Sequence, residues 1–356
     1  MNYVLLLLGI LILLVAIMDL AYTTFSPHGA GKIANFISQG SWKVSLKLCG
    51  NNGTNKTLQV VGIITIWLII FAWVFLIWLG SSLIVSSAEG SVVGAETGLP
   101  ATLAEKFYYT GFTLSTLGVG DFVAGTDGWR IFSVVLSLTG FLLITTAISY
   151  MLPVLAADVQ KKSISRYIIC LGTTPEEILK NHWIDGNFKA LEPHITELMN
   201  MIIVHSQQLL AYPILYCFHN SDPFESTAIN IAKLDEALSI LLVQVSNNVQ
   251  PDHRVLMPLR KAITAFIIMQ KNYFLEEEKG GFSVPELRAL QQSDIPLLRQ
   301  GQEVTEKYSH LEKRRKLISA ILNNEGWRFD QIYEGSPAGI SEWDLREGAF
   351  PKEGAA

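Results

Sequence analysis

Long uncharged apolar stretches dominate the first half of the chain. The first runs from residue 1 to 18 and ends at Asp19, the second runs from 57 to 88 with its most apolar part at 60–79, and the third runs from 131 to 157. A helix needs about 18 or more apolar residues to cross a bilayer. The pattern therefore predicts three transmembrane helices, the first of them within residues 1–25.

The first stretch also has the position of a secretory signal peptide, which would be removed from the mature protein. Its start, MNYVLLLLG, lacks the basic residues that open a signal peptide, and no small-residue cleavage site follows the apolar run. We therefore expect this stretch to be retained as a transmembrane helix.

After residue 157 the apolar positions follow a spacing of three and four, as on one face of a helix. The longest series are Ile231, Leu234, Leu238, Leu241 and Val245, and then Val304, Tyr308, Leu311, Ile318 and Leu322. The pattern predicts an all-helical domain over residues 158–333, followed by a disordered tail over 334–356 that is rich in Gly, Pro and Ala. The basic run at 313–316 is interpreted as a solvated helix face or, alternatively, as a contact with anionic lipid.

The composition favours a membrane protein over a soluble enzyme. Hydrophobic residues make up 49% of the chain and charged residues 17%, against about 25% charged in an ordinary soluble domain, and the mean hydropathy is +0.31. Residues 1–156 hold equal numbers of basic and acidic residues, so the net charge of −5 belongs to the C-terminal part and predicts no nucleic-acid partner. No cluster of nucleophile, base and orienting residue stands out. We expect no enzymatic activity, no cofactor and no chelated transition metal.

The distribution of lysine and arginine predicts the orientation in the membrane. The loop at 26–57 and the segment after the third stretch are basic, whereas the segment at 89–129 has a single lysine and several acidic residues. The basic residues are Lys32, Lys43, Lys47 and Lys56 in the loop, and Lys161, Lys162 and Arg166 after the third stretch. By the positive-inside rule both basic segments are cytoplasmic and the N-terminus lies outside. We expect a multi-pass protein of the plasma membrane.

The loop at 26–57 contains an apolar pattern of its own. Ile33, Phe36, Ile37, Val44 and Leu48 repeat at helical spacing beside the lysines. This spacing favours an amphipathic helix on the inner leaflet, and a solvated loop is the alternative.

The segment between the second and third stretches combines a short apolar run with a glycine pattern. Pro100 precedes a run at 102–114, which is long enough for about three helical turns but too short to cross the membrane. This predicts a re-entrant pore helix inside a pore domain at 58–157. Directly after the run come Thr116, Leu117, Gly118, Val119, Gly120 and Asp121.

The alternation of glycine with branched residues points to ion coordination. Glycine takes positive φ at no steric cost, so residues that alternate between ordinary and mirror-image conformations turn successive carbonyls to the same side. Irregular backbone at membrane depth must be buried or line a water-filled path, and here dehydrated cations satisfy the carbonyl oxygens. The negative dipole end of the short helix faces the inner end of this path. Thr116 is the expected innermost ligand, and Asp121 is expected to concentrate cations or to brace the loop at the outer mouth.

The order of an outer helix, a pore helix, the T-x-G-x-G-D sequence and an inner helix resembles the pore domain of the potassium channel family, over residues 60–157. The resemblance implies a passive channel that holds potassium ions at the filter carbonyls and Thr116. It also implies a homotetramer in the lipid bilayer, because one pore loop supplies a quarter of the ring. By the same resemblance Thr113 and Ser115 belong to the hydroxyl run before the filter, and Gly140 is the gating hinge. The expected cavity residues are Phe141, Ile144 and Ile148.

One departure from the family concerns the filter sequence, which is most often TVGYG. This chain has Leu117 and Val119 and lacks the tyrosine that braces the filter, so we expect flux that prefers potassium without strict selectivity. The alternatives are a weakly selective potassium and sodium channel, and a non-conducting membrane signalling or scaffold protein that uses a pore-like oligomerisation unit. The helical domain at 158–333 is expected to assemble or regulate the channel.

Overall fold

A computed structural model describes residues 1–274, 282–298 and 301–335 of the chain. The tail predicted at 334–356 lies outside the described residues from 336 onward. The chain forms two compact units, and each is assembled from separate stretches of sequence. Unit 1 comprises Met1–Val44, Val60–Asp158 and Gln208–Phe218, whereas unit 2 comprises Ser45–Gln59, Val159–Gln207 and the chain from His219 onward.

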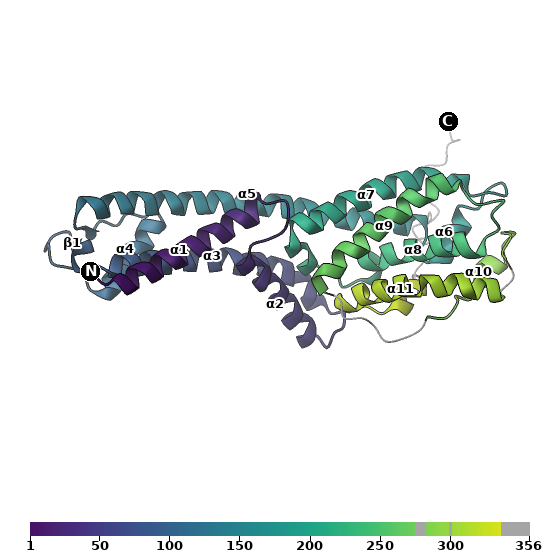
Figure 1. Cartoon of the computed structure of the whole chain (residues 1–356), viewed down its shortest axis with the longest axis horizontal. Coiled ribbons are helices and arrows are strands. Elements are labelled where there is room, and N and C mark those ends of the chain that lie inside the picture. Colours follow the sequence, from purple (N-terminus) through teal and green to yellow (C-terminus); the bar gives the residue numbers. More distant parts are fainter. Residues whose placement is uncertain (275–281, 299–300, 336–356) are drawn as a thin grey trace, which may run out of the picture. The chain divides into compact units, whose positions relative to one another are not determined.

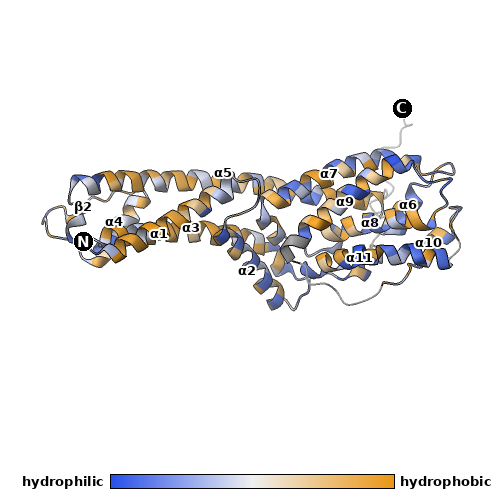
Figure 2. Cartoon of the chain, in the orientation of Figure 1, coloured by the Kyte–Doolittle hydropathy of each residue, from blue (hydrophilic) through white to orange (hydrophobic). Residues whose placement is uncertain are grey.

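Within the described residues, three helices are long and apolar enough to cross a membrane, as the hydropathy pattern predicts. They are α1 (Tyr3–Phe25), α3 (Val61–Ser86, preceded by the 3-10 helix η1 at Lys56–Val60) and α5 (Asp127–Leu171). Apolar residues cover α1, α3 and the first part of α5 (Figure 2). α5 continues beyond the predicted end at 157, because the charged segment that follows contains no helix-breaking residue before Gly172.

α1 and α3 lie side by side and run antiparallel in unit 1 (Figure 1). At one end the Asn2 amide donates to the Ser87 carbonyl over 2.6 Å. In the middle, a Cβ added to Gly9 would lie 2.7 Å from the Gly80 carbonyl oxygen, so glycine is what allows the two backbones to approach. The N-terminus therefore lies beside the C-terminal end of α3.

The helix predicted in the loop between α1 and α3 is present as α2 (Lys32–Leu48). Its first turn is capped by Asp19 of α1, a buried residue. One carboxylate oxygen of Asp19 accepts from the Ile33 amide over 2.8 Å, and the other accepts from the Ala34 amide over 3.2 Å and from the Trp73 indole over 2.9 Å. Asp19 thus ties the start of α2 to both α1 and α3.

The segment between α3 and α5 contains a 3-10 helix, one α-helix and a small sheet. In chain order it forms the 3-10 helix η2 (Glu89–Ser91), strand β1 (Val92–Gly94), helix α4 (Leu103–Leu114) and strand β2 (Phe122–Ala124). The strands pair antiparallel, with Val93 opposite Val123. The sequence predicts α4 but not this pair, because three residues are too few to show an alternating pattern.

Unit 1 is completed by residues 208–218, which arrive from much later in the chain. They include the 3-10 helix η4 (Pro213–Cys217). The Phe218 ring lies 2.8 Å from the place of a Cβ on Gly62, so this ring packs directly on the backbone of α3. Tyr212 meets Tyr150 of α5 edge to face, with ring centroids 6.0 Å apart.

Unit 2 is built from helices that surround α8 (Figure 1). Its elements are α6 (Pro175–Asn181), η3 (Lys189–Leu191), most of α7 (Glu192–Ala211), η5 (Pro223–Glu225), α8 (Thr227–Gln244), α9 (His253–Phe274), α10 (Arg288–Gln291), α11 (Gln302–Asn324) and η6 (Phe329–Tyr333). α8 packs against α6, α9 and α11, and nearly all of its side chains are buried.

Charged residues of α8 lie inside this core. Asp235 pairs with Arg260 over 2.6 Å and with Arg314 over 2.5 Å, and Glu236 pairs with Arg315. Buried charges need such partners, because each would otherwise bear the full cost of leaving water. Both interpretations of the basic run in α11 are therefore wrong for its two arginines, which bind carboxylates inside unit 2.

Candidate functional site

Helix α4 is specified at its start by its own sequence. The Glu105 carboxylate accepts from the Thr102 amide over 2.7 Å, and the Thr102 hydroxyl oxygen accepts from the Glu105 amide over 3.5 Å. This reciprocal pair satisfies two of the amides that a helix start leaves without a partner.

α3 holds one side of α4 through polar contacts. The Trp78 indole donates to the Phe107 carbonyl over 3.0 Å, and the hydroxyls of Ser82 and Thr110 bond to each other over 2.6 Å. Ser82 and Thr110 are fully buried. In a surrounding of low polarity such bonds are strong, so they fix the orientation of α4 against α3.

α5 holds the other side of α4 and presses on its C-terminal end. The Tyr109 hydroxyl bonds to the Ser133 hydroxyl. A Cβ added to Gly140 would lie 1.8 Å from the carbonyl oxygen of Leu114, the last residue of α4. α5 is helical through Gly140. The structure thus gives this glycine a packing contact directly before the filter, which its spacing in the sequence did not reveal.

The three hydroxyl residues that precede or open the filter all bond to nearby carbonyls. Thr113 donates to the Tyr109 carbonyl over 2.7 Å, Ser115 to the Phe112 carbonyl over 3.2 Å, and Thr116 to the Ser115 carbonyl over 2.6 Å. A hydroxyl that donates its proton keeps its lone pairs. The Thr116 oxygen is therefore still able to coordinate a cation through a lone pair.

The backbone of the filter segment alternates in conformation. Thr116, Gly118 and Gly120 have positive φ values of 59°, 60° and 89°, whereas Leu117 and Val119 do not. The alternation expected from Gly118 and Gly120 is thus present. It begins two residues before Gly118, at Thr116. Positive φ is uncommon for a β-branched residue and stores strain, so Thr116 is a feature that sequence reasoning missed.

The outer end of the segment is anchored by Asp121. Its carboxylate accepts from the amide of Phe122 over 3.1 Å, and its negative charge lies near the side chain of Tyr108. Its carbonyl accepts from the Ala95 amide over 2.9 Å. Asp121 thus connects the filter segment to the chain after β1. Tyr108 did not stand out in the sequence, where it is one of two adjacent tyrosines.

The predicted cavity residues share one face of α5. Phe141, Ile144 and Ile148 are exposed, whereas Leu143 and Ala147 on the opposite face are buried. The spacing of three and four keeps the exposed set together on the helix. In a single chain this set therefore contacts no other part of the structure closely enough to be buried.

The filter segment is exposed along its whole length. Residues 115–121 are all exposed, and Leu117 and Val119 have 72% and 50% of their surface accessible. Leu114 before the segment and Ala124 after it are buried. One chain therefore positions this segment firmly at both ends but does not enclose it.

Comparison with known proteins agrees with this geometry. Residues 63–157 match the ion channel family, and the match runs from α3 through α4 and the filter segment into α5. It confirms the resemblance of this part of the chain to a potassium-channel-type pore domain.

Over its whole length the chain is similar to the uncharacterized membrane protein YdjJ of Bacillus subtilis (strain 168). The two are 27% identical over 343 residues, which cover 96% of each chain. No solved structure matches this chain. The protein is therefore a membrane protein in which residues 63–157 match the ion channel family, and its spans contact the lipid bilayer.

Proposed function

From the ion channel domain at 63–157, we propose that the protein is a passive, homotetrameric cation channel that conducts potassium in preference to sodium. The observation that carries this proposal is the alternation of φ at Thr116, Gly118 and Gly120. Backbone that alternates in this way presents its carbonyl oxygens in a row, which replaces the water shell of a permeating cation.

The support around the filter fits this role. α4 is hydrogen-bonded to α3, contacts α5 at Gly140, and ends directly before the filter segment. In our proposal α4 is a re-entrant pore helix, and the negative end of its dipole favours cations at the inner end of the filter. The Thr116 hydroxyl is the innermost ligand there, and the bonds of Asp121 to the amides of Phe122 and Ala95 brace the outer end.

Fourfold assembly follows from the ring that such a filter needs. One chain supplies one filter segment, and residues 115–121 are exposed in it. Four copies enclose the ion path, with Phe141, Ile144 and Ile148 of each copy lining the cavity below and Gly140 acting as the hinge of α5. The helical part at 158–333 assembles or regulates this tetramer.

The proposed orientation places the N-terminus and the filter's outer mouth outside the cell. α1 and α3 run antiparallel, so Asn2 lies beside Ser87 and the N-terminus shares a side with the segment after α3. The loop that contains α2 is rich in lysine and therefore belongs to the cytoplasmic side.

The side chains of the filter segment bear on its selectivity between potassium and sodium. Leu117 and Val119 replace the side chains of the usual filter, so no tyrosine hydroxyl braces the carbonyls. A less rigid ring discriminates less well between cations of different size. We therefore expect preference for potassium and not strict exclusion of sodium.

Flux measurements on the full chain test this function. Purified protein in liposomes, with opposed potassium and sodium gradients, should give a reversal potential nearer to the potassium equilibrium potential. Equal permeability would support the weakly selective alternative. If native mass spectrometry shows a tetramer but the liposomes show no ion flux, the scaffold alternative is supported. A monomer in mild detergent would contradict the proposed tetramer.

A further inference from the structure

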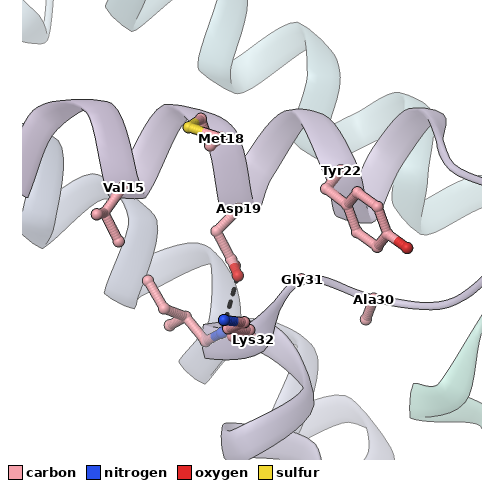
Figure 3. A pocket seen from close by; sticks show the side chains of 8 residues that line it. Val15, Met18, Asp19, Tyr22, Ala30, Gly31 and Lys32 are labelled. Atoms are coloured by element: carbon pink, nitrogen blue, oxygen red, sulfur yellow. Dashed lines mark hydrogen bonds between the residues drawn. The ribbon is translucent and has the colours of Figure 1, made fainter.

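A cavity lies in unit 1, where α1 meets the start of α2 (Figure 3). Its volume is about 490 Å³, within the range of roughly 300–1,000 Å³ that is usual for small-molecule sites. The side chains that line it from α1 are mainly apolar. Its lining residues are Val15, Met18, Asp19, Tyr22, Ala30, Gly31, Lys32 and Ile33.

The carboxylate in this cavity is fully occupied. Asp19 binds the amides of Ile33 and Ala34 and the indole of Trp73 (Figure 3 shows its bond to the start of α2). Its negative charge therefore faces three N–H donors and the positive end of the α2 dipole. Asp19 builds one wall and is not a free ligand for a cation.

The rim of the cavity has the opposite charge. Lys32 is exposed, and its ammonium has neither a hydrogen bond nor an ion pair with any residue that the structure describes. The surrounding sequence strengthens this charge, because residues 20–56 contain four lysines and no aspartate or glutamate. An anion is the complementary ligand.

The remaining walls favour a ligand with an apolar part. Val15, Met18 and Tyr22 lie on α1, and 47%, 69% and 50% of their surface is accessible. α1 is apolar enough to span a membrane, and these residues lie in its last turns, where an aliphatic chain and a head group meet. A small soluble anion would leave this apolar surface uncovered.

We propose that this cavity binds an anionic phospholipid of the surrounding leaflet, with its phosphate at Lys32 and the beginning of an acyl chain against Val15, Met18 and Tyr22. Phe36 of α2 is also exposed, and on this proposal it would lie in the same leaflet as the bound lipid. The proposal depends on α1 crossing the membrane and does not depend on ion conduction.

Native mass spectrometry of the full chain, titrated with phosphatidylglycerol in detergent, tests this site. Lys32→Gln should weaken binding of the tightest lipid about fivefold, the usual effect of one lysine on an anionic lipid. Lys43→Gln is the matched control, because Lys43 is exposed on the same helix but does not line the cavity; it should change binding less than about twofold. Ala30→Leu fills the cavity without changing charge and should also weaken binding.

Two further titrations, with other ligands, identify which part of the lipid is bound. Phosphatidylcholine should bind more weakly than phosphatidylglycerol, and glycerol phosphate, which has no acyl chain, should not bind. Equal losses from Lys32→Gln and Lys43→Gln would reduce the effect to general surface charge and overturn the proposal. Undiminished binding in Ala30→Leu would also overturn the proposal. Disulfide cross-linking between copies of the Met18→Cys variant would overturn it as well, because a second chain would then cover the cavity. Because the readout is lipid binding, these outcomes are separate from any failure of ion flux.

Discussion

Thr116 shows how single residues in the filter segment are strained. Its φ of 59° places a β-branched side chain in the left-handed region, at a cost of about 1–2 kcal/mol. Local bonds hold it there: its amide donates to the Thr113 carbonyl over 3.1 Å, and the next amide, of Leu117, donates to Phe112 over 2.9 Å. Strain that is held in this way is typical of functional backbone.

Gly118→Ala should abolish ion flux while the fold persists. A Cβ at Gly118 meets no atom within 4 Å, so the substitution causes no steric clash. The cost of about 1 kcal/mol per chain comes from the positive φ, and relieving it turns the carbonyl away from the ion path. Liposome flux and the thermal midpoint measure the two effects. Gly128→Ala is the matched control, because Gly128 is also uncrowded but lies in α5 without positive φ; undiminished current in Gly118→Ala would contradict the ion path.

His219 gives unit 2 a dependence on pH. Burial lowers its pKa to about 4, and its Nε2–H donates to the Gly53 carbonyl over 2.7 Å. The unfolded chain binds the proton near pH 6.5 and the folded chain only near pH 4, so stability decreases as the pH falls through this window. The expected loss is about 3 kcal/mol.

Thermal midpoints at about pH 7 and pH 4.5 test this linkage. His219→Gln keeps an N–H donor but cannot be protonated there, so its midpoint should fall less than that of the wild type. His28→Gln removes an exposed histidine and should leave the wild-type pH dependence unchanged. Equal pH dependence in His219→Gln and the wild type would assign the effect to other groups.

At the scale of elements, the contact between α4 and α5 depends on Gly140. Gly140→Ala would place a carbon 1.8 Å from the Leu114 carbonyl oxygen and force the two helices apart. We expect a loss of about 1–3 kcal/mol in stability together with reduced flux. Thermal unfolding and single-channel recording should change together, with Gly128→Ala as control. Unchanged stability with an altered open probability would favour a hinge without the packing role.

The packing of α8 against α11 depends on buried ion pairs. Arg315→Met would leave Glu236 buried without its arginine and should destabilise the protein by about 3–5 kcal/mol. The double variant with Glu236→Met should recover much of this loss. Arg288→Met removes an arginine from an exposed pair with Glu286 and should cost less than about 0.5 kcal/mol. Denaturant unfolding of the full chain distinguishes these cases.

At the scale of the whole molecule, the chain returns to unit 1 after most of α7. Residues 208–218 pack on α3, and Phe218 covers the backbone at Gly62. Phe218→Ala should therefore lower the stability by about 3 kcal/mol or more. Phe36→Ala, which removes a ring with 78% of its surface exposed, should change the stability little when measured in the same detergent.

Truncation after Arg166 extends this test. The truncated chain loses residues 208–218 and most of unit 2, so both its tetramer stability and its currents should change. Unchanged assembly and currents would make the C-terminal helices a separate passenger.

Much of the architecture could be predicted because it depends on patterns that are local in the chain. The three spans follow from runs of apolar residues, α2 from apolar residues at helical spacing, and α4 from a short apolar run after a proline. The missing Cβ allows Gly118 and Gly120 to take positive φ without strain. In each case one stretch of sequence contains the whole physical cause.

The tertiary structure decided which distant groups meet. Asp19 caps α2, Gly140 meets the end of α4, and the arginines of α11 bind carboxylates of α8. None of these pairs can be recognised in the sequence, because the residue type of a carboxylate or a glycine does not show whether its neighbour is water or another helix. The positive φ of Thr116 also had no signal in the sequence, because a β-branched residue takes it only where hydrogen bonds such as those to Thr113 and Phe112 hold it. By itself the sequence determined the long helices, the pore-helix segment and the glycine pattern. Burial and long-range contact determined how the site is held, because the free energy of packing depends on neighbours in space and not along the chain.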